Sequence, residues 1–168
     1  MNHKILLFTL LISSAMFSQQ ANVKDAFLEK WGNSKDYLIA IAELMPEEDY
    51  GYKPTERQRS FTEQLEHIQG NMDWLSTKYF SREKEKSDTF PNKKEQIITS
   101  LEKAFDAVGE TVAATSEEEL KEAVEFFAGP KSKLQILNLL LDHVTHHRGQ
   151  LIVYLNLKEM EPPRYVGW

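Results

Sequence analysis

Apolar residues recur every three or four positions over most of the chain, and this periodicity limits the fold more than any other feature. After Ser60, large apolar side chains follow one another at such spacings: Leu65, Ile68, Met72, Leu75 and Tyr79. This pattern places them on one face of an α-helix. Ser60 and Glu63 also have the spacing of a capping box, in which the hydroxyl and the carboxylate each bond a backbone amide at the start of the helix.

Three further segments show the same helical periodicity: residues 23–45, 92–114 and 132–158. The last of them opens with a second capping pattern, Ser132–Gln135. Pro46 ends the first helix, and Pro162-Pro163 prevents continuation of the last, because proline lacks the amide that a helix needs. Between the third and fourth helices, residues 117–131 hold at most a short helical turn followed by irregular or extended chain. Four long amphipathic helices without a strand signal predict an all-α fold, a four-helix bundle.

The composition describes a globular domain rather than a nucleic-acid-binding one. The chain has 168 residues, 41% of them hydrophobic and 27% charged, which is enough to bury one core. Its net charge is −6, and no stripe of Lys and Arg is available to neutralise phosphates, so we expect no nucleic-acid partner. The absence of cysteine excludes disulfides, a lipid-modified cysteine and a thiol nucleophile of the protein's own.

The amino-terminal segment, residues 1–18, has the layout of a secretory signal peptide. Lys4 supplies the positive end, and Ile5–Ile12 is a nearly unbroken apolar run. Ser13-Ser14-Ala15 is a small-residue cleavage pattern, and cleavage after Ser18 fits equally well. The alternative is a buried amino-terminal helix of the domain itself.

Export follows as an expectation from this layout. The apolar run is too short to span a bilayer, so we expect no stable membrane insertion after cleavage. The mature domain is then the bundle over residues 19–168, in a periplasmic or secreted location.

Two histidines of the last helix lie on one face. A helix turns about 100° per residue, so His143 and His147 are one turn apart, with Cβ atoms about 6 Å from each other. Both imidazoles can therefore reach a single ion. They continue a stripe that flanks the main apolar face: Ile136, Leu140, Gln150 and Tyr154. His146 is rotated toward the polar face, where we expect it to be solvated or to support a ligand rather than to be one.

His67 has a similar place on the helix that follows Ser60. Together with Asn71 and Trp74 it lies about 100° from the apolar face, so the histidines of both helices border the core and can meet at a cleft beside it. No acidic ligand lies on either stripe, which favours Zn²⁺, Ni²⁺ or Fe²⁺ over Mg²⁺ or Ca²⁺. Three protein ligands would leave an open position, as in catalytic metal sites. Hydrogen-bonded structural histidines remain an alternative on spacing alone.

The chain resembles the DinB-like (DinB/YfiT) superfamily of metal-binding four-helix bundles over essentially its whole mature length. Three motifs carry the resemblance: Tyr52-Lys53-Pro54 to Ser60-Phe61, Leu65-Glu66-His67-Ile68, and His143-x-x-x-His147-Arg148-Gly149-Gln150. It implies that His67, His143 and His147 bind a divalent metal ion. Members of this family are often homodimers, and the wide apolar arc of the last helix is compatible with a dimer face, although a fully buried core helix would look the same. One departure is Glu159, at a position before the final prolines where the family usually has glycine; this concerns the end of the helix and not the metal site.

Four residues near the motifs have two interpretations each. Arg148 could clamp a substrate anion near the metal, but its place on the apolar face favours a structural ion pair or a stem packed on the core. Gln150 could orient a bound water or ligand, or bond a neighbouring helix. Asn71 and Trp74 could line the pocket, although core packing is the stronger expectation for Trp74.

The resemblance implies two chemistries for an unidentified small-molecule substrate. A metal at this site would lower the pKa of a bound water or thiol, giving either metal-dependent hydrolysis or S-transfer with a low-molecular-weight thiol. Expected export favours hydrolysis, because the usual thiol cofactors are cytosolic. A bundle that binds a metal or ligand without turnover, or that uses the metal only for stability, is the third possibility.

Overall fold

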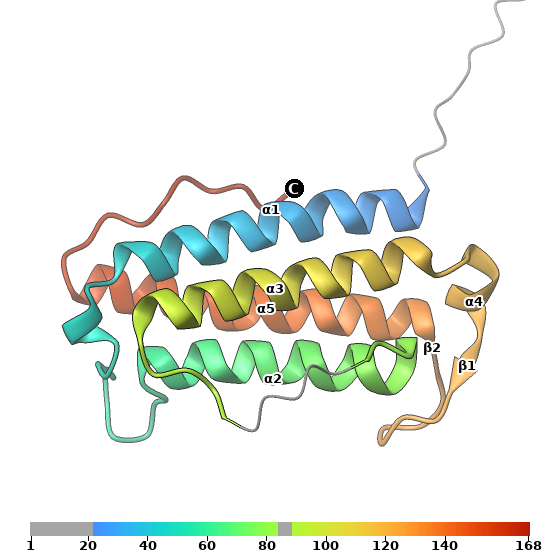
Figure 1. Cartoon of the computed structure of the whole chain (residues 1–168), viewed down its shortest axis with the longest axis horizontal. Helices are drawn as coiled ribbons and strands as arrows, with labels where there is room; N and C mark the ends of the chain where they lie inside the picture. The colour runs from blue at the N-terminus through green and yellow to red at the C-terminus, as the bar shows by residue number, and fades with distance from the viewer. Residues whose placement is uncertain (1–21, 84–88) are drawn as a thin grey trace, which may run out of the picture.

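The computed structural model describes residues 22–83 and 89–168, and the expected signal peptide, residues 1–18, lies outside this part. Four long helices dominate it (Figure 1): α1 (Val23–Leu44), α2 (Phe61–Phe80), α3 (Lys94–Ala114) and α5 (Lys133–Leu157). A 3₁₀ turn (Glu47–Asp49), the short helix α4 (Glu117–Lys121) and the strands β1 (Ala123–Val124) and β2 (Lys131–Ser132) complete it.

The long helices enclose one core, which confirms the predicted all-α four-helix bundle. Around the bundle, α1 packs on α3, α3 on α2, α2 on α5, and α5 on α1. The core contains the apolar faces predicted for the first three helices, with Leu38, Leu65 and Leu101 fully buried. Among the described residues, no helix is both long enough and apolar enough to cross a membrane.

Side-chain caps fix where four of the helices begin, and at α1 the Asn22 side chain accepts the Lys24 amide at 2.8 Å. The capping boxes predicted at Ser60 and Ser132 are both formed, and a third, unpredicted one at Ser116 starts α4. By contrast, Lys93 precedes α3 without a side-chain cap, and this helix begins two residues later than the periodicity predicted. Without such a cap, the sequence marks a helix start only loosely.

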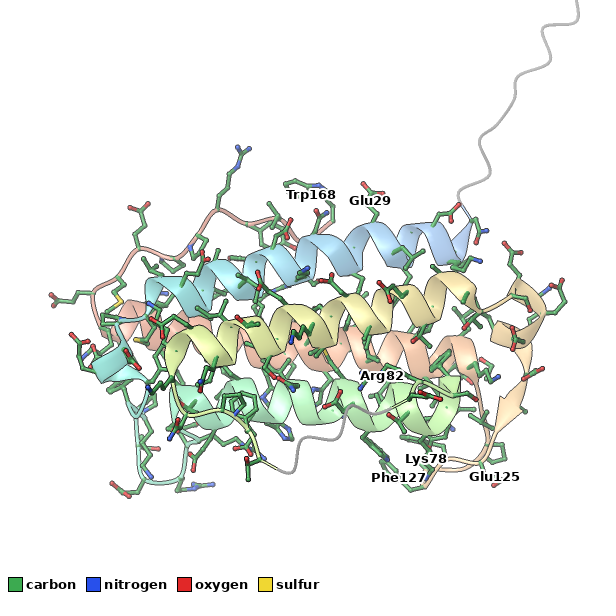
Figure 2. The ribbon with its side chains drawn as sticks, in the orientation of Figure 1. Glu29, Lys78, Arg82, Glu125, Phe127 and Trp168 are labelled. Carbon is green, nitrogen blue, oxygen red and sulfur yellow. The ribbon has the colours of Figure 1, made fainter. Side chains whose placement is uncertain are left out.

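The segment between α4 and α5 is a small hairpin that the sequence did not show as strands. Ala123 pairs with Ser132 and Val124 with Lys131 in antiparallel register. Two residues per strand are too few to display an alternating pattern. The hairpin holds Phe127 at the surface, with 83% of its area exposed, near the end of α2 that carries Lys78 (Figure 2).

The carboxyl-terminal end of α5 closes with a Schellman motif. The Met160 amide donates to the Leu155 carbonyl at 3.0 Å, and the Glu159 amide donates to Asn156 at 3.0 Å. Glu159 has φ +59°, the left-handed conformation that favours glycine. The tail then runs along α1 (Figure 1), where Asn33 donates to the Trp168 carbonyl at 2.5 Å.

Candidate metal centre

The three predicted histidines meet between α2 and α5. His67 comes from α2, while His143 and His147 come from one face of α5, and one ring nitrogen from each lies within 4.8 Å of the other two. The ring centroids are 4.4 to 4.8 Å apart. Antiparallel packing of α2 on α5 brings His67 opposite the one-turn interval between the two α5 histidines.

The nitrogen spacing suits a shared ion. The Nε2 atoms of His143 and His67 are 3.1 Å apart. Two nitrogens bound at 2.0–2.1 Å to one tetrahedral zinc ion lie about 3.3 Å from each other. The three imidazoles therefore fit a divalent metal that prefers nitrogen ligands, such as Zn²⁺, Ni²⁺ or Fe²⁺.

Gln64 fixes the orientation of His147. The Nδ1 atom of His147 lies 2.8 Å from Oε1 of Gln64, where it donates its proton to the amide oxygen. His147 is only 6% exposed, so this hydrogen bond holds the ring in one position. Its other nitrogen, Nε2, keeps a lone pair for a metal, which is the usual arrangement around metal-binding histidines.

A hydrogen-bonded network holds Gln64 in turn. Its Nε2 donates to Oε1 of Gln150 at 2.5 Å and to the Tyr154 hydroxyl at 3.3 Å. The Tyr154 hydroxyl donates to the Arg59 carbonyl at 2.7 Å. Gln150 also contacts His146, 2.9 Å away, and His146 itself is exposed, on the polar face as predicted. Sequence reasoning missed Gln64, although it stands one turn before His67 on the same helix.

Two buried polar atoms near the histidines have no hydrogen-bond partner among the described residues: Nδ1 of His143 and Oδ1 of Asn71. Asn71 stands one turn after His67, on the side of α2 that faces the pocket. A buried polar atom without a partner is costly, so such atoms indicate a place for a water or a ligand. Their location shows where a bound molecule would find hydrogen bonds.

The environment keeps all three imidazoles neutral near pH 7. Burial, followed by repulsion from the other histidines and from Arg59, lowers the pKa of His143 to about 4. Burial, followed by the charges of His67, His146 and Arg59, lowers the pKa of His147 to about 4. Burial, and next Arg59, also lowers the pKa of His67. Neutral imidazole is the form that binds metals.

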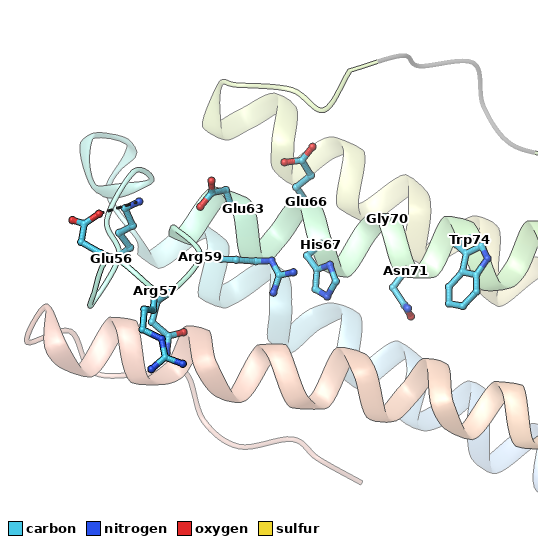
Figure 3. Close-up of a pocket in the computed structure, with 11 residues that line it drawn as sticks. Glu56, Arg57, Arg59, Glu63, Glu66, His67, Gly70, Asn71 and Trp74 are labelled. Atoms are coloured by element: carbon cyan, nitrogen blue, oxygen red, sulfur yellow. Dashed lines mark ion pairs between the residues drawn. The ribbon is translucent and has the colours of Figure 1, made fainter. Parts of the chain in front are cut away.

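A pocket of about 810 Å³ opens beside His67 (Figure 3). It is formed by one side of α2 and by the loop that precedes this helix, and Asn71 and Trp74 line it further along α2. Trp74 is 40% exposed, so the expectation that it packs in the core is wrong. Its ring lies at the pocket edge because the hairpin after α4 gives it aromatic neighbours there.

Arg148 points away from this site. It is 3% exposed, and its guanidinium carbon lies 4.8 Å from the ring centroid of Tyr37 on α1. No carboxylate pairs with it in the described part of the chain, and its Nη1 has no partner there. The next residue, Gly149, is exposed, and a Cβ atom at this position would have no neighbour within 4 Å.

Comparison with known proteins agrees with the four-helix fold. Two solved structures share the fold: a DinB-like protein from Bacillus cereus ATCC 10987, with 18% identity and a TM-score of 0.73, and a DinB-like protein from Bacillus subtilis, with 20% identity and a TM-score of 0.69. They cover 84% and 83% of this chain, and 97% of their own chains is covered in each case. No curated protein matches the sequence. The DinB family matches residues 16–165, nearly the whole chain, and the protein therefore belongs to the DinB family.

Proposed function

We propose that this protein is a metal-dependent hydrolase, with a divalent ion held by His67, His143 and His147. The observation that carries the proposal is the convergence of three neutral imidazoles at a site whose His67 side borders an open pocket. Three protein ligands are typical of catalytic metal sites, whereas structural sites use four. When bound, such an ion lowers the pKa of a water at its open position and supplies a nucleophile near neutral pH.

Three further residues would orient a ligand of the ion or polarise the substrate. Gln64 accepts the proton on Nδ1 of His147, which leaves the Nε2 lone pair of this ring to hold an ion. The positive charge of Arg59 contributes to the lowered pKa of all three histidines. The same charge would stabilise negative charge that develops on a substrate oxygen. Asn71 offers an unpaired amide oxygen to a donor of the substrate.

The signal-peptide layout of residues 1–18 supports hydrolysis over S-transfer, because an exported protein is separated from the cytosolic thiol cofactors. We therefore propose that the mature protein works outside the cytoplasm. Fractionation of cells that express the intact chain, with amino-terminal sequencing of the product, tests this location. Uncleaved chain in the cytoplasm would contradict this location and would favour S-transfer over hydrolysis.

Metal content is the first test of function. Purified wild-type protein should hold about one divalent ion per chain, and His67→Ala and His143→Ala should hold almost none. Thr145→Ala is the matched control, because Thr145 is exposed on the same helix and should leave the content unchanged. No metal in the wild type, or equal loading in His143→Ala, would contradict the proposal.

Turnover is the second test. Metal-loaded protein should hydrolyse members of a panel of chromogenic esters and amides, lose this activity on chelation and regain it when the metal is restored. Activity with a low-molecular-weight thiol as acceptor, and none with water, would instead indicate S-transfer. Metal loading without either reaction would indicate a binding protein.

A further inference from the structure

The pocket beside His67 has two chemically different ends. One end is the loop before α2, which carries the cations Lys53, Arg57 and Arg59. The other end is Trp74, which belongs to a cluster of aromatic rings. Figure 3 shows four side chains projecting from this stretch toward α5: Arg59, His67, Asn71 and Trp74.

At the cationic end, the Lys53 ammonium lies 4.0 Å from the Glu56 carboxylate, so the charge without a counter-ion is that of the two arginines. Within residues 22–83 and 89–168, neither Arg57 nor Arg59 forms an ion pair. Glu63 and Glu66 also line the pocket, but neither forms an ion pair with Arg59, and the Glu63 carboxylate accepts the Ser60 amide at 2.6 Å in the capping box. Arg59 therefore presents a free guanidinium beside the histidines, suited to a carboxylate or another oxyanion.

The aromatic end combines two elements of the fold. The Trp74 ring lies 6.2 Å from the Phe126 ring and 6.5 Å from the Phe127 ring, measured between centroids. The Phe126 and Phe127 rings are 4.2 Å apart between centroids and tilted by 38°, and Phe127 is 83% exposed. Large exposed aromatic surface at the edge of a pocket is typical of sites that bind apolar or aromatic groups.

The two ends are spaced for one small molecule. His67 and Trp74 are seven residues apart on α2, so they lie on nearly the same face at a separation of about 10 Å along the helix. Asn71 lies between them, with its Oδ1 buried and without a partner among the described residues. A ligand that reaches from Arg59 to Trp74 would pass both the histidines and this acceptor.

We propose that the pocket binds a small amphipathic anion, with its anionic group on Arg59 beside the three histidines and its aromatic or long apolar group against Trp74. A hydrogen-bond donor near the middle of the ligand, such as an amide N–H, would bond Oδ1 of Asn71. Only the interpretation of this ligand as a substrate rests on the proposed hydrolase function. The binding itself depends on Arg59, Asn71 and Trp74.

Calorimetric titration with a matched set of probes tests the proposal. The main probe is 6-phenylhexanoate, which has an anionic head and a ring at about the required distance. Its controls are 6-phenylhexan-1-ol without the charge, hexanoate without the ring, and phenylacetate, which is too short. We expect 6-phenylhexanoate to bind at least about tenfold more tightly than the alcohol, as a charge-assisted hydrogen bond would give. Hexanoate and phenylacetate should each bind several-fold more weakly, because they lose the aromatic contact.

Substitutions assign the two preferences to residues. Arg59→Gln should remove the preference for the anion over the alcohol, and Arg59→Lys should retain most of it. Trp74→Ala should remove the preference for the ring, and Trp74→Phe should retain it. Arg164→Gln and Trp168→Ala are matched controls, because both residues are exposed in the tail, and they should change neither ratio. Equal binding of acid and alcohol, or ratios unchanged in Arg59→Gln and Trp74→Ala, would overturn the proposal.

The same titrations separate this inference from the proposed function. They are made on metal-free and on zinc-loaded protein, and the ratios assigned to Arg59 and Trp74 should persist in both. A protein that takes up no metal but keeps these ratios would contradict the hydrolase and support the ligand class. Metal-dependent turnover, without the affinity ratios assigned to Arg59 and Trp74, would support the hydrolase and contradict the ligand class.

Discussion

His147 and Arg148 are neighbours in α5, and both are buried, yet they belong to two unlike regions. His147 faces α2, where it is neutral near pH 7, bonded to Gln64 and part of a converging set of nitrogens. Arg148 faces α1, where the Tyr37 ring lies against its guanidinium and no carboxylate accompanies it in the described chain. The region around His147 has the ligands for a metal ion, whereas Arg148 packs inside the bundle.

The difference shows how far a sequence motif can be read as a site. Successive residues of a helix point about 100° apart, so the adjacent letters of His147-Arg148 cannot share a pocket. A buried guanidinium also has a long apolar stem that packs well, which gives Arg148 a role without any ligand. Membership of a motif therefore does not place Arg148 at the metal centre.

A pair of apolar substitutions tests whether His147 and Arg148 have separate roles. His147→Leu should reduce metal affinity more than 100-fold, beyond the 10- to 100-fold typical of residues that only support a ligand. Arg148→Met should leave metal content at the wild-type value. Equilibrium dialysis with zinc measures both. Loss of metal in Arg148→Met, with the fold intact by circular dichroism, would show that Arg148 also contributes to metal binding.

The second prediction concerns stability on the Arg148 side. Arg148→Ala should lower the free energy of unfolding by about 2–4 kcal/mol, because it removes a long buried stem and leaves a cavity. Arg148→Met should stay within about 1 kcal/mol of the wild type or exceed it, because it keeps the packing and removes a buried charge that lacks a counter-ion. Urea denaturation of the metal-free protein gives both values. A large loss in Arg148→Met would mean that the charge itself is needed.

The third prediction uses pH. The pKa of His143 and of His147 falls from about 6.5 in the unfolded chain to about 4 in the folded one, so between these values the unfolded state binds more protons. Their contribution to stability is complete above pH 6.5 and is lost as the pH falls toward 4, by at most about 3 kcal/mol for each histidine in the metal-free protein.

The measurement is the difference between the pH–stability curves of wild type and the double variant His143→Leu/His147→Leu. Subtraction removes the contribution of carboxylates common to both proteins. Arg148→Met should give a curve parallel to wild type over this range, because the guanidinium stays charged throughout. A difference curve that stays flat from pH 6.5 to 4 would contradict the lowered pKa values.

The fourth prediction tests the support of His147. Gln64→Leu should weaken zinc binding by about 10- to 100-fold, because His147 loses the acceptor that fixes its ring and its tautomer. Gln69→Leu is the matched control on the same helix, since the Gln69 side chain accepts a hydrogen bond from Ser100 on α3. Competition with a chromophoric chelator measures both affinities. Equal affinities in the two variants would show that the Gln64 contact does not orient the ligand.

The smallest expected change in stability is at the carboxyl-terminal end of α5, far from the metal centre. Glu159→Gly should raise the free energy of unfolding by about 1 kcal/mol, because glycine adopts the left-handed conformation at φ +59° without the strain of a Cβ atom. Metal content should not change. Thermal unfolding checks the gain, and a lower melting temperature would indicate that the Glu159 side chain makes a stabilising contact.

Helical geometry explains what the sequence could predict. The four-helix architecture, the capping boxes at Ser60 and Ser132, and the common face of His143 and His147 all follow from local spacing. These features depend on residues within one or two helical turns of each other, where the backbone alone fixes the geometry.

The missed features depend on contacts between distant segments. Gln64 matters because antiparallel packing brings it against His147, 83 residues away. Trp74 lies at the surface because a hairpin over fifty residues later supplies Phe127 as its neighbour. Arg59 reaches the histidines from an irregular loop, for which no periodicity gives a direction. No local pattern in a single sequence encodes such relations.

The loop that carries Arg59 is fastened at both of its ends. The Phe61 amide donates to the Tyr52 carbonyl at 2.9 Å, the Thr62 amide to the Tyr50 carbonyl at 2.9 Å, and the Tyr154 hydroxyl bonds Arg59 itself. A segment already ordered in this way loses little conformational entropy when a molecule settles against it. Association should therefore proceed without a slow closure step, and the heat of binding should reflect the contacts formed rather than the folding of a loop.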